Sequence, residues 1–252
     1  ERTMRITLVC VLICLLIQPA WSQEKVQPRW LIDSPTAGLL PRGSFAVDVR
    51  LYEGNGILTQ MEMGVFDRAS VGFSFGGQHI VGNQGARWNP RVEFAGRIRV
   101  LEETAGLPAL AVGYDSQGYG AYNSDLGRYT TKSKGLYAVL SKNYGVPVGE
   151  LGIHGGVNRS LEDSDGDADF SGFAGLDFLL GKWVVLLAEY DFAVNNNGDA
   201  TLGTGRGVMN LGGRWLFSDR FSVGLDLRDV SQDGQRNPHP ERQIRLMYSE
   251  KF

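Results

Sequence analysis

The sequence predicts an all-β fold, an antiparallel up-and-down transmembrane β-barrel of about twelve strands. The pattern that predicts it is clearest between residues 91 and 100. This segment alternates charged and apolar side chains, with Arg91, Glu93, Arg97 and Arg99 at odd positions and Val92, Phe94, Ile98 and Val100 at even positions. Successive side chains of a strand point to opposite faces, so one face is charged and the other apolar. About a dozen such segments follow one another, which is typical of a barrel with lipid outside and a polar lumen inside.

The composition argues against two other classes of protein. The 252 residues carry a formal net charge of −3, whereas nucleic-acid-binding proteins are usually distinctly basic, so we expect no nucleic-acid partner. The mean hydropathy of −0.16 is too polar for a bundle of membrane helices but ordinary for a barrel. A soluble β-sandwich or soluble barrel would alternate in the same way, with its apolar face turned inward. The features of both chain ends favour the membrane.

Residues 1–22 have the features of a secretory signal peptide. A positive residue, Arg5, precedes an apolar run of 12 residues from Ile6 to Ile17, which is too short to span a bilayer. Small residues at the expected spacing predict cleavage before Gln23. The only two cysteines of the chain, Cys10 and Cys14, lie in this segment. The chain after cleavage therefore has no disulfide, thiol nucleophile or cysteine-bound metal.

The remaining chain divides into an N-terminal periplasmic segment, residues 23–42, and a barrel, residues 43–252. We expect twelve strands at residues 44–53, 56–66, 70–81, 89–102, 108–117, 133–144, 148–159, 170–180, 183–194, 205–217, 221–230 and 241–252. No segment sustains the apolar periodicity of a helix. The strands at 133–144 and 170–180 are apolar on both faces in places, so their orientation stays open.

The connections between these strands alternate in length. Short turns such as 67–69, 181–182 and 218–220 alternate with longer loops such as 118–132, 160–169 and 231–240, as in outer-membrane barrels with periplasmic termini. The first hairpin, near Asn55, is short where a long loop is expected. The last strand places Tyr248 and the terminal Phe252 on one apolar face. This resembles the C-terminal signal read by the outer-membrane barrel assembly machinery, an expected partner together with outer-membrane lipid and lipopolysaccharide.

If the apolar face meets lipid, the opposite face lines the lumen. The candidate lumen-lining residues are Arg50, Glu62, Arg91, Glu93, Arg97, Arg99, Glu150, His154, Glu189, Asp191, Arg206, Arg214, Asp226 and Arg228, together with Asp48, Gln60, Asp115, Asn210 and Arg245. Charges of both signs are compatible with an ion-paired, closed interior or with a polar channel whose wall charges set selectivity. The basic strip of Arg91, Arg97 and Arg99 is the candidate contact for an acidic saccharide.

Two further features suggest a metal site and a catalytic site. Four carboxylates alternate along one external loop, Asp163, Asp165, Asp167 and Asp169, and carboxylates suit Ca²⁺, although the spacing is not that of an EF-hand. A solvated acidic loop is the other interpretation, and we expect no other cofactor. His154 invites comparison with the outer-membrane phospholipase, a barrel with a His/Ser/Asn site. That site must face lipid, whereas His154 shares the lumenal face, so lipid hydrolysis is the weakest alternative.

One stretch carries a family resemblance. The run WLIDSPTAGLLPRGSF, residues 30–45, resembles the opening of the YjbH-type outer-membrane proteins associated with exopolysaccharide production. Shorter phrases agree, namely ALAVGYDSQGYGAY at 109–122, Ser133-Lys134 and AEYD at 188–191. Members of that family are usually much longer, so this chain would match one barrel-sized part. The resemblance implies a non-enzymatic barrel in exopolysaccharide export or surface polysaccharide organisation, with polysaccharide as a partner, and it supplies no catalytic residues.

Two hypotheses about function remain beside it. The first is a passive porin for small acidic oligosaccharides or other anions, and the second is a lipid-modifying barrel enzyme. The N-terminal segment is either a disordered leader or a plug in the barrel or at its periplasmic mouth. In the plug hypothesis Trp30, Leu31 and Ile32 are anchors, and Asp33 meets a lumenal arginine.

Overall fold

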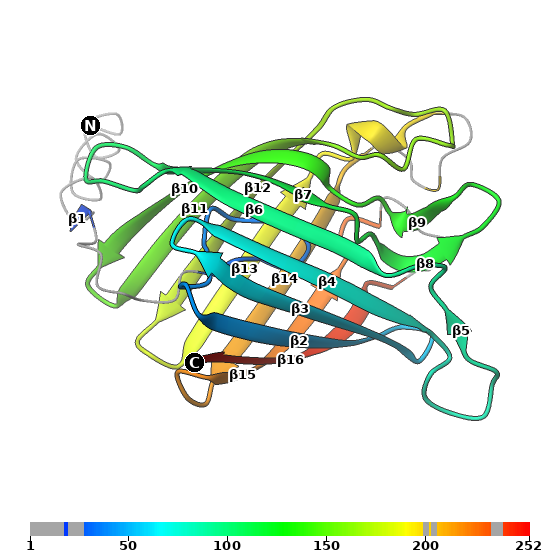
Figure 1. The fold of residues 1–252 in the computed structure, drawn as a ribbon, viewed down its shortest axis with the longest axis horizontal. Coiled ribbons are helices and arrows are strands. Elements are labelled where there is room, and N and C mark those ends of the chain that lie inside the picture. Colours follow the sequence, from blue (N-terminus) through cyan, green and yellow to red (C-terminus); the bar gives the residue numbers. More distant parts are fainter. Residues whose placement is uncertain (1–17, 20–27, 199–201, 203–205, 233–238) are drawn as a thin grey trace, which may run out of the picture.

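The computed structural model describes residues 18–19, 28–198, 202, 206–232 and 239–252. It is a closed barrel in which every strand pairs antiparallel with its neighbours (Figure 1). The twelve barrel strands are β2 (Ser44–Tyr52), β3 (Gly56–Phe66), β4 (Ala69–Gln78), β6 (Glu93–Leu101), β7 (Ala109–Asp115), β10 (Gly135–Val146), β11 (Gly149–Arg159), β12 (Ser171–Leu180), β13 (Val184–Asp191), β14 (Val208–Leu216), β15 (Phe221–Arg228) and β16 (Glu241–Lys251). The predicted fold class and all twelve predicted strands are confirmed.

Two pairings close the ring. β16 pairs with β2, joining the last strand to the first, and β7 pairs with β10 across the longest interruption of the barrel sequence. Both ends of the barrel sequence and most short turns lie at one rim, and the long loops lie at the other together with the short first hairpin near Asn55 (Figure 1). By the rule for outer-membrane barrels, the first rim is periplasmic and the second extracellular.

The remaining elements are short. The loop between β7 and β10 forms a hairpin of β8 (Tyr119–Asn123) and β9 (Arg128–Thr131). β5 (Arg87–Trp88) pairs antiparallel with the end of β4, and a 3-10 turn spans Val194–Asn196. Within the described residues, no helix is long and apolar enough to cross a membrane. Of the predicted signal peptide only Gln18 and Pro19 are described, as β1 beside the end of β10, so that prediction lies outside the described residues.

The faces of the strands follow the predicted alternation. In β6, Phe94 and Ile98 are 62% and 55% exposed, whereas Glu93 and Arg97 are buried. The exposed apolar band is framed by aromatic residues at both rims. The extracellular rim has a stacked pair, Phe75–Trp88, and an edge-on pair, Tyr190–Phe192. The periplasmic rim has a stacked pair, Trp215–Phe217, and a tilted pair, Phe45–Phe252. Such girdles are typical of the two membrane interfaces of a barrel.

Candidate functional site: a plugged lumen

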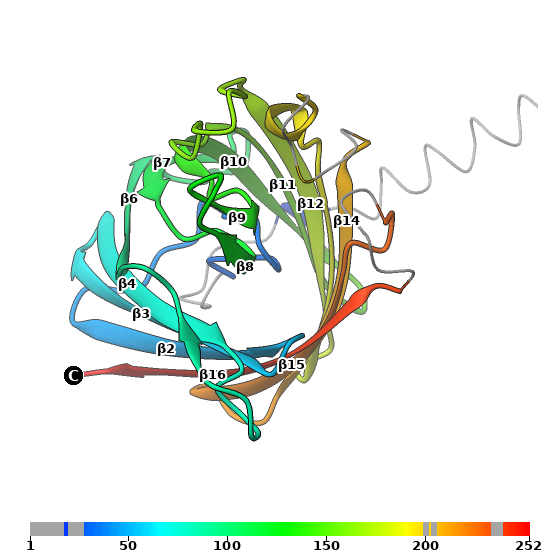
Figure 2. The same ribbon diagram turned by 90° about the vertical axis from the view of Figure 1, so that its right-hand side faces the viewer.

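The N-terminal segment runs inside the barrel rather than beside it. Residues 31–40 are all buried, and in Figure 2 this blue segment lies within the ring of strands. We call residues 28–41 the plug. It contains a bridge between Trp30 and Pro35, so its first part folds into a compact turn. The residues singled out as candidate anchors, Trp30, Leu31, Ile32 and Asp33, all belong to this turn.

A carboxylate of the plug lies between two arginines of the barrel wall. Asp33 Oδ1 accepts a hydrogen bond from Arg50 Nη1 at 2.8 Å, and its Oδ2 accepts one from Arg228 Nε at 2.7 Å. All three side chains are buried. A buried carboxylate shared by two guanidinium groups is a strong and directional contact. Asp33 therefore fixes the plug at one position between β2 and β15.

The wall also holds the same turn through a carboxylate of its own, two strands away from β15. Glu189, on β13, accepts hydrogen bonds from the backbone N–H groups of Ile32, Asp33 and Ser34 at 3.0, 2.8 and 2.9 Å. Asn210 Nδ2 donates to the same carboxylate at 2.7 Å. Consecutive N–H groups that converge on one anion form a nest. The plug thus binds the wall through one of its own carboxylates, and the wall binds the plug through another.

Further arginines of the wall donate to carbonyl oxygens of the plug. Arg97 Nη1 donates to Arg29 O at 2.8 Å and to Gly38 O at 2.7 Å, and Arg99 Nε donates to Ala37 O at 2.9 Å. Carbonyls of the plug turn receive hydrogen bonds from two more wall residues, Arg214 and Arg245. With Arg50 and Arg228, six wall arginines contact the plug. Four of them, Arg97, Arg99, Arg214 and Arg245, satisfy carbonyl groups that have no sheet partner inside the barrel.

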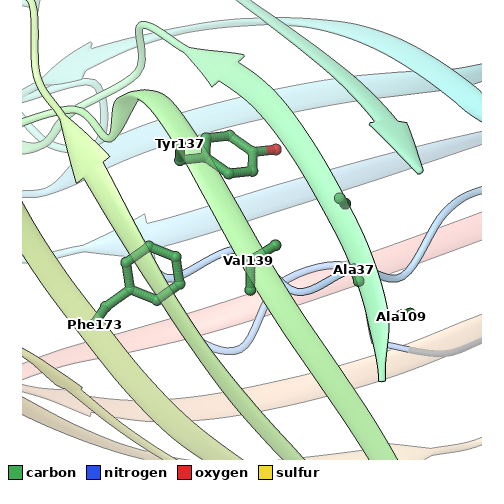
Figure 3. Packing of buried hydrophobic residues seen from close by; sticks show 6 residues of the cluster. Ala37, Ala109, Tyr137, Val139 and Phe173 are labelled. Carbon is green, nitrogen blue, oxygen red and sulfur yellow. The ribbon is translucent and has the colours of Figure 1, made fainter. Parts of the chain in front are cut away.

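Apolar contacts complete the seat of the plug. Ala37 packs in a buried cluster with Ala109, Ala111, Tyr137, Val139 and Phe173 from β7, β10 and β12, and Figure 3 shows most of these side chains beside the plug segment. A second cluster joins Leu31 and Ile32 to Leu187 of β13. These contacts explain why β10 and β12 are apolar on both faces, because one face meets lipid and the other meets the plug.

A chain of polar side chains supports the same seat. Ser141 Oγ accepts a hydrogen bond from the Ala37 N–H at 2.8 Å and lies 2.8 Å from His154 Nδ1. His154 Nε2 lies 2.7 Å from Asp177 Oδ1. The three residue types are those of a hydrolase triad, but Ser141 is buried and its oxygen is occupied by the plug amide. This arrangement positions the plug and gives no support to lipid hydrolysis.

The β8–β9 hairpin enters the lumen from the extracellular side (Figure 2). The Arg50 guanidinium lies 4.4 Å from the centre of the Tyr119 ring, and the Arg228 guanidinium lies 5.5 Å from it. Arg50 Nη2 also donates to the Tyr119 hydroxyl at 3.3 Å. The two arginines that hold Asp33 thus also contact the hairpin, so plug and hairpin meet across one pair of cations.

Loops outside the membrane hold the hairpin in place. Asp165 accepts hydrogen bonds from Arg128 at 2.7 Å and Lys132 at 2.8 Å, and Glu162 accepts one from the Tyr129 N–H at 3.0 Å. Burial alone would raise the pKa of Asp165, but the hydrogen bonds from Lys132 and Arg128 hold it below its usual range. Burial raises the pKa of Glu162, against the opposing effect of its hydrogen bonds. We call this set of contacts the cap.

The acidic loop does not form the suggested calcium site. Asp165 binds the two cations of the cap, and Asp167 accepts from the N–H groups of Asn197 and Gly198. Asp163 and Asp169 are exposed. Among the described residues, no group of three or more acidic, histidine or cysteine side chains is arranged to hold a metal ion. Two carboxylates of the loop therefore serve as structural acceptors instead.

Two of the candidate lumenal residues lie elsewhere. Arg206 is exposed in the loop before β14, because that strand begins at Val208 and not at residue 205. Arg91 precedes β6, and its half-exposed side chain lies at the extracellular rim, 3.0 Å from Glu93. The other candidates lie on inward-facing positions of the strands, namely Arg50, Glu62, Glu93, Arg97, Arg99, Glu150, His154, Glu189, Asp191, Arg214, Asp226 and Arg228. Only Arg97 and Arg99 of the basic strip therefore reach the lumen, and both contact the plug.

Sequence reasoning missed three parts of the site: Tyr119 of the hairpin, the cations Arg128 and Lys132, and Asp177. The sequence gives little indication of these residues' roles, because the hairpin lies in a segment predicted to be a long external loop. A clearer signal was the inward glycine Gly175, where an added Cβ would lie 2.3 Å from Leu31 Cδ1. Small residues facing a lumen indicate that another part of the chain approaches closely.

Cavities beside the plug and the hairpin are small. One of about 40 Å³ lies near Asn158 and Arg228, one of about 30 Å³ near Trp30 and Glu62, and one of about 10 Å³ near Arg50. A single water needs roughly 10–15 Å³ of such space, so these cavities hold a few waters at most.

Comparisons with known proteins support the architecture. A scan against protein-family models finds no match, and a search of curated proteins finds none. Among solved structures, the KdgM porin is 7% identical, with 81% of this chain and 98% of that chain covered and a TM-score of 0.50. The protein is a bacterial outer-membrane β-barrel.

Two further barrels are less similar. The NanC porin is 8% identical over 82% of this chain and 99% of its own, with a TM-score of 0.45. An outer-membrane channel from Pseudomonas putida F1 is 13% identical over 88% of this chain and 100% of its own, with a TM-score of 0.42. Identities this low show the fold alone. The resemblance to the YjbH-type family receives no support from the family scan and stays a prediction.

Proposed function

We propose that this barrel is a porin-like channel for small anions, acidic saccharides among them, and that its own plug closes it. The observation that carries the proposal is that more cations than carboxylates of the wall bind the plug. Six wall arginines donate to oxygens of the plug, whereas two wall carboxylates, Glu62 and Glu189, accept from the plug. Departure of the plug would take an acceptor from six arginines and a donor from two carboxylates, while Arg228, Arg245 and Arg99 keep their ion pairs with Glu241, Asp48 and Glu102.

The position of these arginines supports an anion pathway. Arg97 and Arg99 lie on β6, Arg214 on β14 and Arg245 on β16, so they face the lumen from opposite walls. Wall charges of one sign lower the barrier for ions of the opposite sign. The Asp33 carboxylate between Arg50 and Arg228 occupies the place where a passing carboxylate would bind. The Asp33 carboxylate is the one of these plug groups that an acidic sugar also carries, since the other arginines bind peptide carbonyls.

Two other functions are supported by fewer observations. Exopolysaccharide export rests on the sequence resemblance, and nothing in the structure or the comparisons adds to it. A purely structural barrel would keep its ion pairs permanently and would never conduct. The difference between a channel and a structural barrel is measurable, because only a channel conducts when the plug is removed.

The test is a planar-bilayer recording of the protein and of a variant lacking residues 24–42. We expect low current from the complete chain, and a large current with a reversal potential favouring chloride over potassium from the deletion variant. Liposome swelling should show faster entry of glucuronate than of glucosamine. Heat-modifiable migration in gels verifies that the deletion variant is folded. A folded variant that stays closed contradicts the role of the plug, and cation selectivity contradicts the proposed substrate class.

A matched pair of substitutions separates wall charge from plug removal. In the deletion background, Arg97→Gln removes a cation of the lumen, whereas Arg206→Gln removes an exposed cation outside it. We expect Arg97→Gln to reduce the anion preference and Arg206→Gln to leave it unchanged. Equal effects would mean that overall charge, and not the lumenal wall, sets selectivity.

A further inference from the structure

The lipid-facing wall of the barrel is hollowed on one side. A groove of about 480 Å³ crosses β4, β6, β7 and β10 on the outer surface. Its exposed walls are apolar, and they are formed by Val65, Phe66, Val71, Ile98, Val112 and Leu136. Arg97 and Tyr137 also border the groove, but their side chains are buried and face the lumen. The groove thus lies in the apolar band framed by the two aromatic girdles.

A missing side chain accounts for the depth of this groove. The strand register aligns Val71 of β4, Gly96 of β6, Tyr114 of β7 and Leu136 of β10 in one row across the wall. A Cβ added at Gly96 would meet no atom within 4 Å, so the position is open to the membrane. Phe94 and Ile98, on either side of it along β6, are both more than half exposed. Gly96 therefore forms the floor between two rows of tall side chains.

A cation lies at the periplasmic end of the groove. Phe66 and Ala69, which line the groove, flank the turn that carries Arg68. The Arg68 side chain is 63% exposed and lies 3.5 Å from Glu102, which is itself exposed. An arginine at the edge of the hydrocarbon region can hydrogen-bond a lipid phosphate while the apolar surface beside it accepts an acyl chain.

We propose that this groove is a specific lipid site, which binds one acyl chain of a glycerophospholipid from the periplasmic leaflet with its phosphate against Arg68. The periplasmic position of Arg68 favours a leaflet phospholipid over lipopolysaccharide. The acyl chain fills the empty space above Gly96. Burial of its apolar surface against the groove supplies the attraction. The site is independent of conduction through the lumen and of the plug.

Native mass spectrometry of the complete protein tests this proposal. In it, 1-palmitoyl-2-oleoyl-phosphatidylglycerol is titrated into the detergent. Gly96→Leu fills the floor of the groove. Gly213→Leu is the matched control, because Gly213 is an outward position of β14 where an added Cβ also meets nothing within 4 Å. We expect the protein and Gly213→Leu to retain one phospholipid, and Gly96→Leu to need about tenfold more lipid for the same occupancy, a difference of one decade in affinity.

A second measurement tests the contact between Arg68 and the lipid phosphate. Arg68→Gln should weaken retention of phosphatidylglycerol but leave retention of the matching diacylglycerol unchanged, because diacylglycerol has no phosphate. Heat-modifiable migration shows that each variant is folded. Equal lipid retention by Gly96→Leu and Gly213→Leu overturns the groove as a site. A bound mass of lipopolysaccharide, or of a second copy of the chain, that Gly96→Leu abolishes would overturn the phospholipid as its occupant.

Discussion

The Arg50 guanidinium lies 2.8 Å from the Asp33 carboxylate and 4.4 Å from the centre of the Tyr119 ring, with all three side chains buried. Asp33 belongs to the plug, which enters from the periplasmic rim, and Tyr119 belongs to the hairpin, which enters from the extracellular rim. One wall residue thus joins the two obstructions of the lumen.

Replacing Asp33 by alanine removes the carboxylate that Arg50 and Arg228 share. Breaking a buried ion pair by removing one partner costs about 3–5 kcal/mol. We expect the plug to leave the lumen in part of the molecules and the single-channel open time to rise by roughly a hundredfold to several thousandfold, since each 1.4 kcal/mol is tenfold. Asp163→Ala in the exposed loop is the control. Unchanged gating in Asp33→Ala contradicts the latch role of this carboxylate.

Replacing Glu189 by glutamine weakens the nest of three backbone N–H groups. A hydrogen bond to a charged acceptor contributes about 1.5–3 kcal/mol, and a neutral amide accepts more weakly. We expect faster proteolysis within residues 28–41 and a roughly tenfold rise in open time. Glu103→Gln at the periplasmic turn, where Glu103 binds Asn143, is the matched control. If both variants behave alike, Glu189 has no special role in holding the plug.

The hairpin residue Tyr119 allows a graded test. Tyr119→Phe keeps the ring beside Arg50 and Arg228 and loses only the hydroxyl contact at 3.3 Å. Tyr119→Ala loses the ring as well, together with its cation–π contacts of about 0.5–2 kcal/mol. In the variant lacking residues 24–42, we expect Tyr119→Phe to conduct like its parent and Tyr119→Ala to conduct more. Equal conductance in both would place the hairpin outside the ion path.

The cap should loosen in acid. The pKa of Asp165 is lower in the folded protein than in the unfolded chain, so its ionised form stabilises the cap above pH of about 4, and this stabilisation is lost as the pH falls through the folded value. Glu162 acts oppositely, because its raised pKa adds stability at low pH that is lost as the pH rises. Hydrogen exchange of residues 119–131 measures the sum of the two effects.

Two variants separate these effects. Asp165→Asn should make exchange at neutral pH faster and should abolish its further increase below pH of about 4. Glu162→Gln should keep the acid-induced increase and make it steeper, because the opposing group is gone. An acid response that survives in Asp165→Asn assigns the effect to other groups.

The sequence alone determined the barrel. Alternation with a period of two, as in β6, and turn residues between strands act over a few positions, so they can be read along the chain. The same local pattern placed Phe94 toward lipid and Arg97 toward the lumen. It failed at Arg91 and Arg206, because the ends of strands depend on the length of the neighbouring strand and not on alternation.

Only the tertiary structure decided what fills the lumen. Glu189 meets the backbone N–H groups of residues 32–34, and Arg228 meets Asp33, although these groups are far apart in the chain. Such pairings arise from closure of the ring, which brings β2 beside β16 and places opposite walls around one segment. Strand periodicity says which face a residue occupies and nothing about which residue lies across the lumen. For that reason the sequence left open a closed interior or a channel, whereas the fold shows a plug held inside the lumen by arginines of the wall and by Glu189.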